Sequence, residues 1–182
     1  MRELGCEVIT LRAGFPPSMV FDIAPDLVLL SPGPGSPDDF DLIPLVGEIS
    51  FKKIPLFGVC LGHQAIGQHF GAELSKLPIP FHGKPSEITH NNGLFHNSIN
   101  NPFTAGRYHS LYLKNDSIPE CLEVTAHTEY THSDGQKEII PMAITHKNLP
   151  IASVQFHPES LMTLDKNAGH MILKNAIEVL TS

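Results

Sequence analysis

The chain has few cysteines and no long apolar run. Only three of its 182 residues are cysteine, and none of them shows C-x-x-C spacing. This argues against a disulfide scaffold or a Cys/His zinc site, and it is typical of a protein of the reducing cytoplasm. No apolar stretch approaches the roughly 20 residues that a membrane-spanning helix needs. We therefore expect no contact with a membrane.

Positive charge is also scarce. Twelve Lys and Arg residues stand against 19 Asp and Glu residues, which gives a net charge of −7, and no basic patch is present. Nucleic-acid binding is therefore not expected. The eleven histidines are scattered, without an H-E-x-x-H pattern, so we expect no metal and no cofactor. The hydrophobic content of 41% suits one globular domain over residues 1–182.

Apolar runs alternate with helical patterns along the chain, which predicts a three-layer α/β fold. We expect strands at residues 6–11, 27–30, 55–59, 88–89, 111–113, 124–128, 142–145 and 151–156, several of them antiparallel, and helices at 39–50, 61–70 and 165–180. Asp165 is the expected N-cap of the last helix. The Asp134-Gly135 pair predicts a hairpin turn.

Cys60 occupies the most informative stretch, Gly58-Val59-Cys60-Leu61-Gly62, between an expected strand and the helix at 61–70. Glycines on both sides permit a tight turn that presents the cysteine at its apex, which is typical of a nucleophile elbow. The helix N-terminus would favour a thiolate and offer N–H groups to an oxyanion. A cysteine after a strand is more commonly a small core residue, so both interpretations stand on this motif alone.

Two other segments bear on this choice. The loop Ser31–Pro37, rich in proline and glycine, follows the expected strand at 27–30 and would present backbone N–H groups at the ligand-binding edge of an α/β sheet. His157 and Glu159 follow the strand at 151–156, so His157 can act as a base for Cys60 and Glu159 can orient its ring. Taken alone, the loop could equally be a surface turn, and His157 could equally be a structural histidine.

Five motifs occur in order along nearly the whole chain. They are Pro32-Gly33-Pro34-Gly35, Gly58-Val59-Cys60-Leu61-Gly62-His63-Gln64, His82-Gly83-Lys84, Arg107-Tyr108-His109-Ser110-Leu111 and Gln155-Phe156-His157-Pro158-Glu159-Ser160. Together they resemble the class I (triad) glutamine amidotransferases, in particular the glutaminase component of anthranilate synthase and its relative in aminodeoxychorismate synthase. The resemblance implies a flavodoxin-like fold: an open, mostly parallel sheet with helices on both faces and an additional antiparallel region.

The resemblance also implies a function and a set of site residues. The family hydrolyses glutamine and hands the ammonia to a chorismate-using synthase, which is a separate subunit or a fused half. Cys60 matches the nucleophile, and His157 and Glu159 match the rest of the catalytic triad. Positions that bind glutamine or its oxyanion are matched by Gly33, Pro34, Gly35, Leu61, Gln64, Ser110 and Leu111. The segment Phe81-His82-Gly83-Lys84 resembles the family's partner-facing loop.

The chain departs from the family in three places. Ser153 stands where the family commonly has glycine, a small change that we expect to be tolerated, and the hairpin segment 130–138 is longer than usual. Residues 1–5 resemble the last turn of the family's first helix, so the first strand and most of that helix are missing. We therefore expect an N-terminally truncated domain, such as a piece of a fused anthranilate synthase.

Three alternatives stay open. The chorismate-linked branch includes both the anthranilate (tryptophan) and the aminodeoxychorismate (folate) route, and the motifs do not separate them. A truncated, non-functional remnant would keep the motifs without folding. A γ-glutamyl peptidase on the same scaffold would share the elbow, but the segment 107–111 and the Pro-Gly loop favour the chorismate-linked branch.

Overall fold

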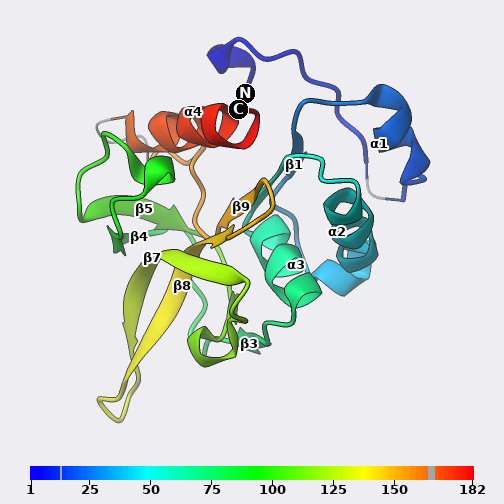
Figure 1. Cartoon of the computed structure of the whole chain (residues 1–182). Helices are drawn as coiled ribbons and strands as arrows, with labels where there is room; N and C mark the ends of the chain where they lie inside the picture. Colours follow the sequence, from blue (N-terminus) through cyan, green and yellow to red (C-terminus); the bar gives the residue numbers. More distant parts are fainter. Residues whose placement is uncertain (13, 164–166) are drawn as a thin grey trace.

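The computed structural model describes residues 1–12, 14–163 and 167–182, and its centre is a seven-stranded sheet (Figure 1). The strand order is β1-β2-β9-β8-β7-β4-β5. The bounds are β1 Val28–Leu30, β2 Leu56–Val59, β4 Lys84–His90, β5 Phe103–Arg107, β7 Leu122–Thr131, β8 Lys137–His146 and β9 Ile151–Val154. A separate two-stranded sheet pairs β3 (Leu74–Lys76) with β6 (Leu111–Leu113).

The main sheet has a parallel part and an antiparallel part. Strand β2 pairs in parallel with β1 and with β9. From β9 onward, each neighbouring pair is antiparallel, through β8, β7, β4 and β5. The long β7–β8 hairpin turns at residues 132–136, where Gly135 has a φ of 84°. The predicted α/β fold with an additional antiparallel region is therefore confirmed, as is the turn at Asp134-Gly135.

Helices cover both faces of the parallel part. The α-helices are α1 Ser18–Ile23, α2 Leu42–Phe51, α3 Leu61–Phe70 and α4 Ala168–Leu180, and short 3₁₀ turns lie at Arg2–Leu4, Pro37–Phe40, Leu94–His96 and Asn115–Ser117. Helices α2 and α3 lie together on one face, and α4 lies on the other (Figure 1). Successive side chains of β2 point to opposite faces of the sheet, which explains this arrangement: Leu56 packs with α2 and α3, whereas Phe57 packs with α4.

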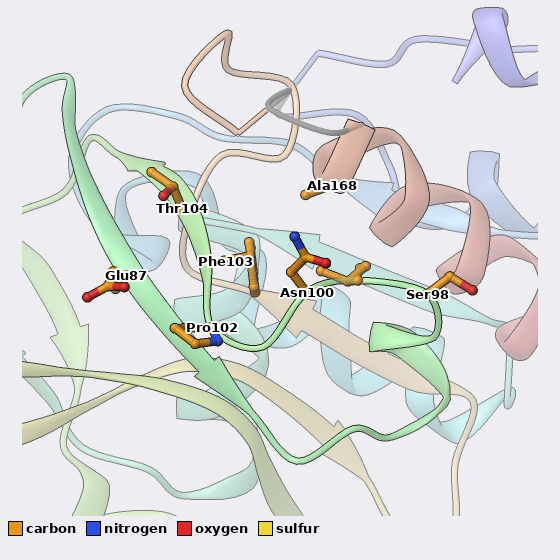
Figure 2. A pocket seen from close by; sticks show the side chains of 8 residues that line it. Glu87, Ser98, Asn100, Pro102, Phe103, Thr104 and Ala168 are labelled. Carbon is orange, nitrogen blue, oxygen red and sulfur yellow. The ribbon is translucent and has the colours of Figure 1, made fainter.

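A small pocket lies beside the beginning of α4 (Figure 2). Glu87 and Thr104 line it from β4 and β5, Asn100 lines it from the connecting loop, and Ala168 lines it from α4. The residues that line it include neither Cys60 nor His157. This pocket is therefore separate from the predicted nucleophile.

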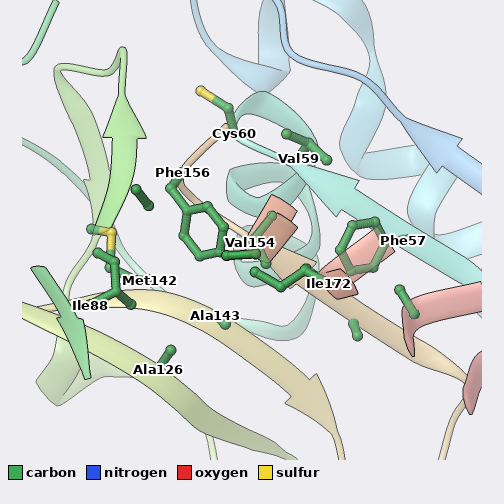
Figure 3. Close-up of a cluster of buried hydrophobic side chains, with 14 of the residues drawn as sticks. Phe57, Val59, Cys60, Ile88, Ala126, Met142, Ala143, Val154, Phe156 and Ile172 are labelled. Atoms are coloured by element: carbon green, nitrogen blue, oxygen red, sulfur yellow. The ribbon is translucent and has the colours of Figure 1, made fainter. Parts of the chain in front are cut away.

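The core on the α4 side reaches up to Cys60 (Figure 3). Phe57, Val154, Phe156 and Ile172 pack there at almost no exposure to solvent. Each such side chain contributes about 1.5–3 kcal/mol of burial free energy. The Cys60 sulfur points away from the cluster in Figure 3. The backbone of Cys60 is thus anchored on a rigid core, and its thiol, although buried, points away from that core.

Most predicted elements are present, and one prediction was wrong. Helix α3 and strand β6 have the predicted bounds, and α2 is shifted. Strands β4, β7 and β8 are longer than predicted, strands β1, β2 and β9 are shorter, and α1, β3 and β5 were not predicted. The predicted strand at residues 6–11 is not a strand, because it pairs with no strand in the described part of the chain. The helix predicted from residue 39 begins at Leu42, after a 3₁₀ turn at Pro37–Phe40 that is followed by Asp41 at a φ of 51°. Asp165, the predicted N-cap, lies outside the described residues.

Candidate active site

Cys60 sits at a strained turn between β2 and α3. Its φ of 52° and ψ of −96° are unusual for a non-glycine residue, and its N–H donates to Val154 O at 2.8 Å. The flanking glycines make the turn possible. A Cβ on Gly58 would lie 2.6 Å from the Gly62 carbonyl carbon, and one on Gly62 would lie 2.5 Å from Leu30 O. The sequence motif therefore produces the tight elbow that its glycines predicted.

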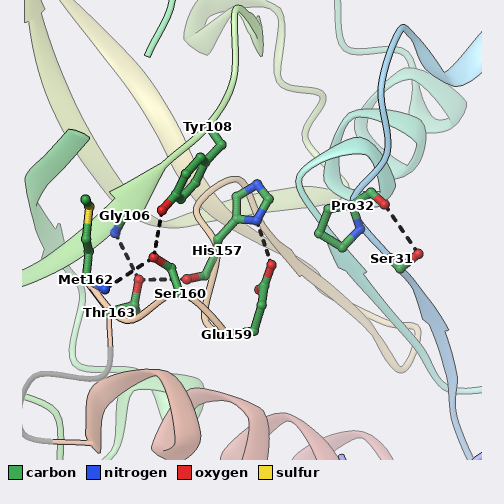
Figure 4. Close-up of polar contacts among 9 residues, drawn as sticks. All are labelled: Ser31, Pro32, Gly106, Tyr108, His157, Glu159, Ser160, Met162 and Thr163. Atoms are coloured by element: carbon green, nitrogen blue, oxygen red, sulfur yellow. Dashed lines mark hydrogen bonds and ion pairs between the residues drawn. The ribbon is translucent and has the colours of Figure 1, made fainter. Parts of the chain in front are cut away.

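His157 and Glu159 lie together just beyond strand β9 (Figure 4). Nδ1 of His157 is 2.7 Å from Oε1 of Glu159. Two hydrogen bonds hold the His157 backbone: its N–H donates to Gly106 O at 3.1 Å, and its carbonyl accepts from Thr163 Oγ1 at 2.7 Å. The His157 ring is packed edge-on against the Tyr108 ring, with 4.9 Å between the ring centroids. Because β9 is hydrogen-bonded to β2, this segment begins beside the elbow of Cys60.

The charge on His157 is stabilised by its neighbours. Burial lowers the pKa of His157, but hydrogen bonding to Cys60 and Glu159 and their negative charges outweigh it and raise the pKa to about 9. For Glu159, burial raises the pKa, but the hydrogen bond and charge of His157 bring it below its usual value. Nε2 of His157 is buried and has no partner of regular hydrogen-bond geometry among the described residues. No hydrogen bond of regular geometry therefore joins the Cys60 thiol to this nitrogen, and catalytic hydrogen bonds are commonly loose before substrate binds.

The Pro-Gly loop lies against the beginning of α3. A Cβ on Gly33 would lie 2.8 Å from Cδ2 of Leu61, so the loop and the helix are in close contact. The loop is stiffened by Asp39, whose Oδ2 accepts from the Ser36 N–H at 2.7 Å and from the Ser36 hydroxyl at 3.0 Å. Pro34 and Gly35, with a φ of 74° at Gly35, form its tip. The Leu61 N–H, first in α3, has no acceptor in a preceding helical turn and is available to an oxyanion.

Gln64 and the segment around Leu111 are also brought together. The Gln64 Nε2 group donates to Leu111 O at 3.0 Å and to Gln155 Oε1 at 3.2 Å. Both N–H groups of the amide are therefore used, and Oε1 remains as an acceptor. Ser110 precedes Leu111, and its carbonyl accepts from the Leu77 N–H at 2.7 Å. Gln64 lies in the first turn of α3, and its N–H donates to Cys60 O at 3.1 Å.

The loop that resembles a partner-facing segment is joined to this region. The Phe81 N–H donates to His109 O and the Gly83 N–H donates to Arg107 O, both at 3.0 Å. The guanidinium carbon of Arg107 lies 3.5 Å from the centre of the Phe81 ring. A displacement of residues 81–83 would therefore be transmitted to the chain before Leu111.

Ser153, where we expected a departure from the family, forms a polar contact of its own. The Ser153 hydroxyl lies 3.0 Å from Nδ1 of His63, and both side chains are fully buried. Burial lowers the pKa of His63 to about 3, so the ring is neutral. A serine is therefore accommodated beside the elbow because it has a polar partner there.

Sequence reasoning gave no role to Arg107, His109 or Gln155, although all three lie inside the motifs. They are almost completely buried. The sequence offered one indication of a role for them, which is that Arg107 and His109 stand together in one motif. Their burial became visible only in the structure. Among the described residues, no group of three or more His, Cys, Asp or Glu side chains is arranged to hold a metal ion, and no helix has the length and apolar character to cross a membrane.

Comparisons with known proteins identify glutamine amidotransferases or synthases that contain them. The family model for glutamine amidotransferase class-I matches residues 1–179. An anthranilate synthase of Azospirillum brasilense is 41% identical over 182 residues, which is all of this chain but only 24% of that protein. Anthranilate synthase component 2 of Pseudomonas aeruginosa is 47% identical over 154 residues, or 84% of this chain and 73% of that protein. Aminodeoxychorismate/anthranilate synthase component 2 of Bacillus subtilis is 41% identical over 177 residues, or 97% and 86%.

A solved structure agrees with these sequences. The chain matches the crystal structure of a protein of Thermoplasma acidophilum assigned as a GMP synthase subunit, with a TM-score of 0.80 and 26% identity. The match covers 98% of this chain and 83% of that one. The arrangement of sheet and helices is therefore shared with a known structure over almost the full length of the described chain.

Proposed function

Because the chain belongs to the class I glutamine amidotransferase family, we propose that it hydrolyses glutamine to glutamate and ammonia through a thioester on Cys60. The observation that carries the proposal is the pairing of an elbow cysteine with the His157–Glu159 pair at the ends of neighbouring parallel strands. A surface turn or a core cysteine would need neither the strained backbone of Cys60 nor the raised pKa of His157.

The first step forms the thioester. The Cys60 thiolate attacks the side-chain carbonyl carbon of glutamine and forms a C–S bond, and the carbonyl oxygen takes up the negative charge. Protonated His157 then gives its proton to the amide nitrogen, the C–N bond breaks, and ammonia leaves. A pKa of about 9 keeps this proton on His157 at neutral pH. The histidine is thus an acid at the moment when the leaving nitrogen needs one.

The second step clears the thioester. Neutral His157 takes a proton from water as the water oxygen attacks the carbonyl carbon, and the C–S bond breaks to return the thiolate and release glutamate. Glu159 stabilises the imidazolium in both steps. The Leu61 N–H and the loop at Gly33–Gly35 stabilise the oxyanion. Each such donor contributes about 3 kcal/mol of barrier lowering.

Glutamine is held by Gln64, Ser110 and Leu111 in this proposal. Oxygen Oε1 of Gln64 accepts from the α-ammonium group, since both N–H groups of its amide are already used. Gln64 lies in the first turn of α3, and its N–H donates to Cys60 O at 3.1 Å. This placement suits the far end of a glutamine whose carboxamide carbon is at Cys60, rather than the carboxamide itself.

The ammonia is passed to a chorismate-using synthase that makes anthranilate for tryptophan biosynthesis. The relatives named as anthranilate synthase or its component 2 support this assignment. The Bacillus subtilis relative is named for both routes, which keeps aminodeoxychorismate for folate as a second candidate. We place the protein in the cytoplasm, since its three cysteines form no disulfide among the described residues.

The test measures glutamate released from glutamine with and without a chorismate-using synthase. The expected result is hydrolysis that depends on Cys60 and is lost in Cys60→Ser. With chorismate present, the product identifies the branch, since anthranilate and aminodeoxychorismate are distinguishable by mass. Full hydrolysis by Cys60→Ser, or no hydrolysis by the unaltered chain with either synthase, would refute the proposal.

A further inference from the structure

A directional chain of buried hydrogen bonds runs beside the active site. It begins at Arg107, whose Nε–H donates to Nε2 of His109 at 3.0 Å. A guanidinium can only donate, so Nε2 of His109 must accept and the ring proton lies on Nδ1. That proton is donated to Leu111 O at 2.9 Å. Leu111 O also accepts from Gln64, and Gln64 donates its other N–H to Gln155.

The chain fixes which way the Gln64 amide faces. Rotating the amide by half a turn would place its oxygen against the oxygens of Leu111 and Gln155, which cannot donate to it in this arrangement. Exposure to solvent is 1% for Arg107, 4% for His109, 2% for Gln64 and 0% for Gln155, so water does not compete for these bonds. Within the Gln64 amide, the group that these bonds leave over is therefore its acceptor oxygen, whereas the buried groups of this network without a partner among the described residues are two donors, Nη2 of Arg107 and Nε2 of Gln155.

We propose that His109 is a positioning residue for glutamine, fixed in one tautomer by Arg107, which orients the Leu111 carbonyl and through it the acceptor oxygen of Gln64. The inference rests on the proposed function and adds residues that act at a distance from the substrate. Its consequence is selectivity: the oriented oxygen favours a substrate with an α-ammonium group over one without it.

The electrostatics of His109 fit this role. Burial, together with the nearby charge of Arg107, lowers the pKa of His109 to about 3. The ring is neutral at any pH where the enzyme would work, so one nitrogen is always an acceptor for Arg107 and the other always a donor to Leu111. The Phe81 ring stacks beside the His109 ring at 6.2 Å between centroids and 20° between planes. This contact limits rotation of the imidazole.

Two substitutions of His109 separate its two hydrogen bonds. His109→Asn places an amide N–H near the position of Nδ1 and keeps a donor for Leu111 O. His109→Gln places its amide near the position of Nε2, so it keeps a partner for Arg107 but loses the donor to Leu111 O. The measurement is kcat and KM for L-glutamine and for glutaramate, which is glutamine without the α-ammonium group, in the presence of the synthase.

The expected result is a change in selectivity. His109→Gln lowers the preference for glutamine over glutaramate by about tenfold, the effect of misdirecting one hydrogen bond to a charged group, chiefly through a higher KM for glutamine. His109→Asn restores most of the preference. Alkylation of Cys60 by iodoacetamide, which needs no glutamine subsite, proceeds at the same rate in both variants. A merely structural role would lower activity with both substrates alike and leave their ratio unchanged.

A third variant decides the matter if His109→Gln does not fold. Gln155→Met removes the second acceptor of the Gln64 amide at similar volume, and it should lower the same preference by about threefold or more. If all folded variants keep the preference of the unaltered chain, the inference is wrong while the proposed function stands. If the unaltered chain with synthase hydrolyses no glutamine, the proposed function itself fails and the inference fails with it.

Discussion

The substitution Glu159→Gln tests how the active site holds its proton. Glu159 accepts a hydrogen bond from His157 at 2.7 Å and helps to raise the pKa of His157 to about 9. A hydrogen bond to a charged group is worth about 1.5–3 kcal/mol, and the Glu159 side chain is 54% exposed, which screens its charge. We therefore take a value just below this range, about 1.4 kcal/mol, which corresponds to a tenfold change in proton affinity.

The sign of the effect follows from the role of His157. Imidazolium is the acid that protonates the leaving nitrogen, so activity is present below the pKa of His157 and is lost as pH rises through about 9. In Glu159→Gln the alkaline limb of the pH–activity curve moves to lower pH by about one pH unit. Glutamate release with the synthase present, measured from neutral to alkaline pH, gives the position of that limb.

A matched control and a contrary result complete the test. Glu178→Gln removes an exposed carboxylate of α4 that lies 3.7 Å from Lys174, and it should leave the pH–activity curve unchanged. If Glu159→Gln keeps the alkaline limb where the unaltered chain has it, Glu159 does not hold the His157 proton. The triad would then reduce to a Cys60–His157 pair with Glu159 as a bystander.

Three further predictions concern the elbow and the hairpin. Cys60→Ser should lower glutamine hydrolysis by about 10³-fold or more with an unchanged melting temperature, measured by glutamate release and calorimetry; a smaller loss would count against Cys60 as nucleophile. Gly58→Ala should lower the free energy of unfolding by about 1–3 kcal/mol, because its Cβ would lie 2.6 Å from a Gly62 backbone atom, and urea unfolding at unaltered stability would contradict this. Tyr112→Phe, which removes a 2.6 Å hydrogen bond to Glu138, should cost about 1 kcal/mol in the same assay, and a neutral result would mean that the bond contributes nothing net.

The sequence predicted the elements that local residue types determine. Helix α3 begins and ends as predicted because an elbow precedes it and Gly71, with a φ of 108°, ends it. The strands next to the elbow were found from apolar runs, since parallel strands are buried on both faces. Residues 6–11 show why such patterns fail elsewhere. Their alternation suits a strand, but a strand also needs a hydrogen-bonded neighbour, and the sequence pattern does not reveal whether one is present.

The residues of the candidate site also form two groups, those that the sequence pattern identifies and those that it does not. Cys60, His157 and Glu159 stand out because nucleophile, base and acid have recognisable chemistry and spacing. The chain from Arg107 through His109 and Leu111 to Gln64 and Gln155 does not stand out, because its two bonds from Gln64 join residues 47 and 91 positions apart. Only the folded sheet brings these residues together, and only their burial makes each hydrogen bond obligatory.

The pairing of Val59 with Val154 has a consequence for folding experiments. It holds the elbow and the histidine segment at the spacing of adjacent strands, about 4.8 Å, and a slip of one residue would turn every side chain of β9 to the opposite face. Catalytic activity is therefore a reporter of correct strand alignment. During refolding, enzyme turnover should reappear together with the slow, long-range docking of β9 and later than the helical circular dichroism signal.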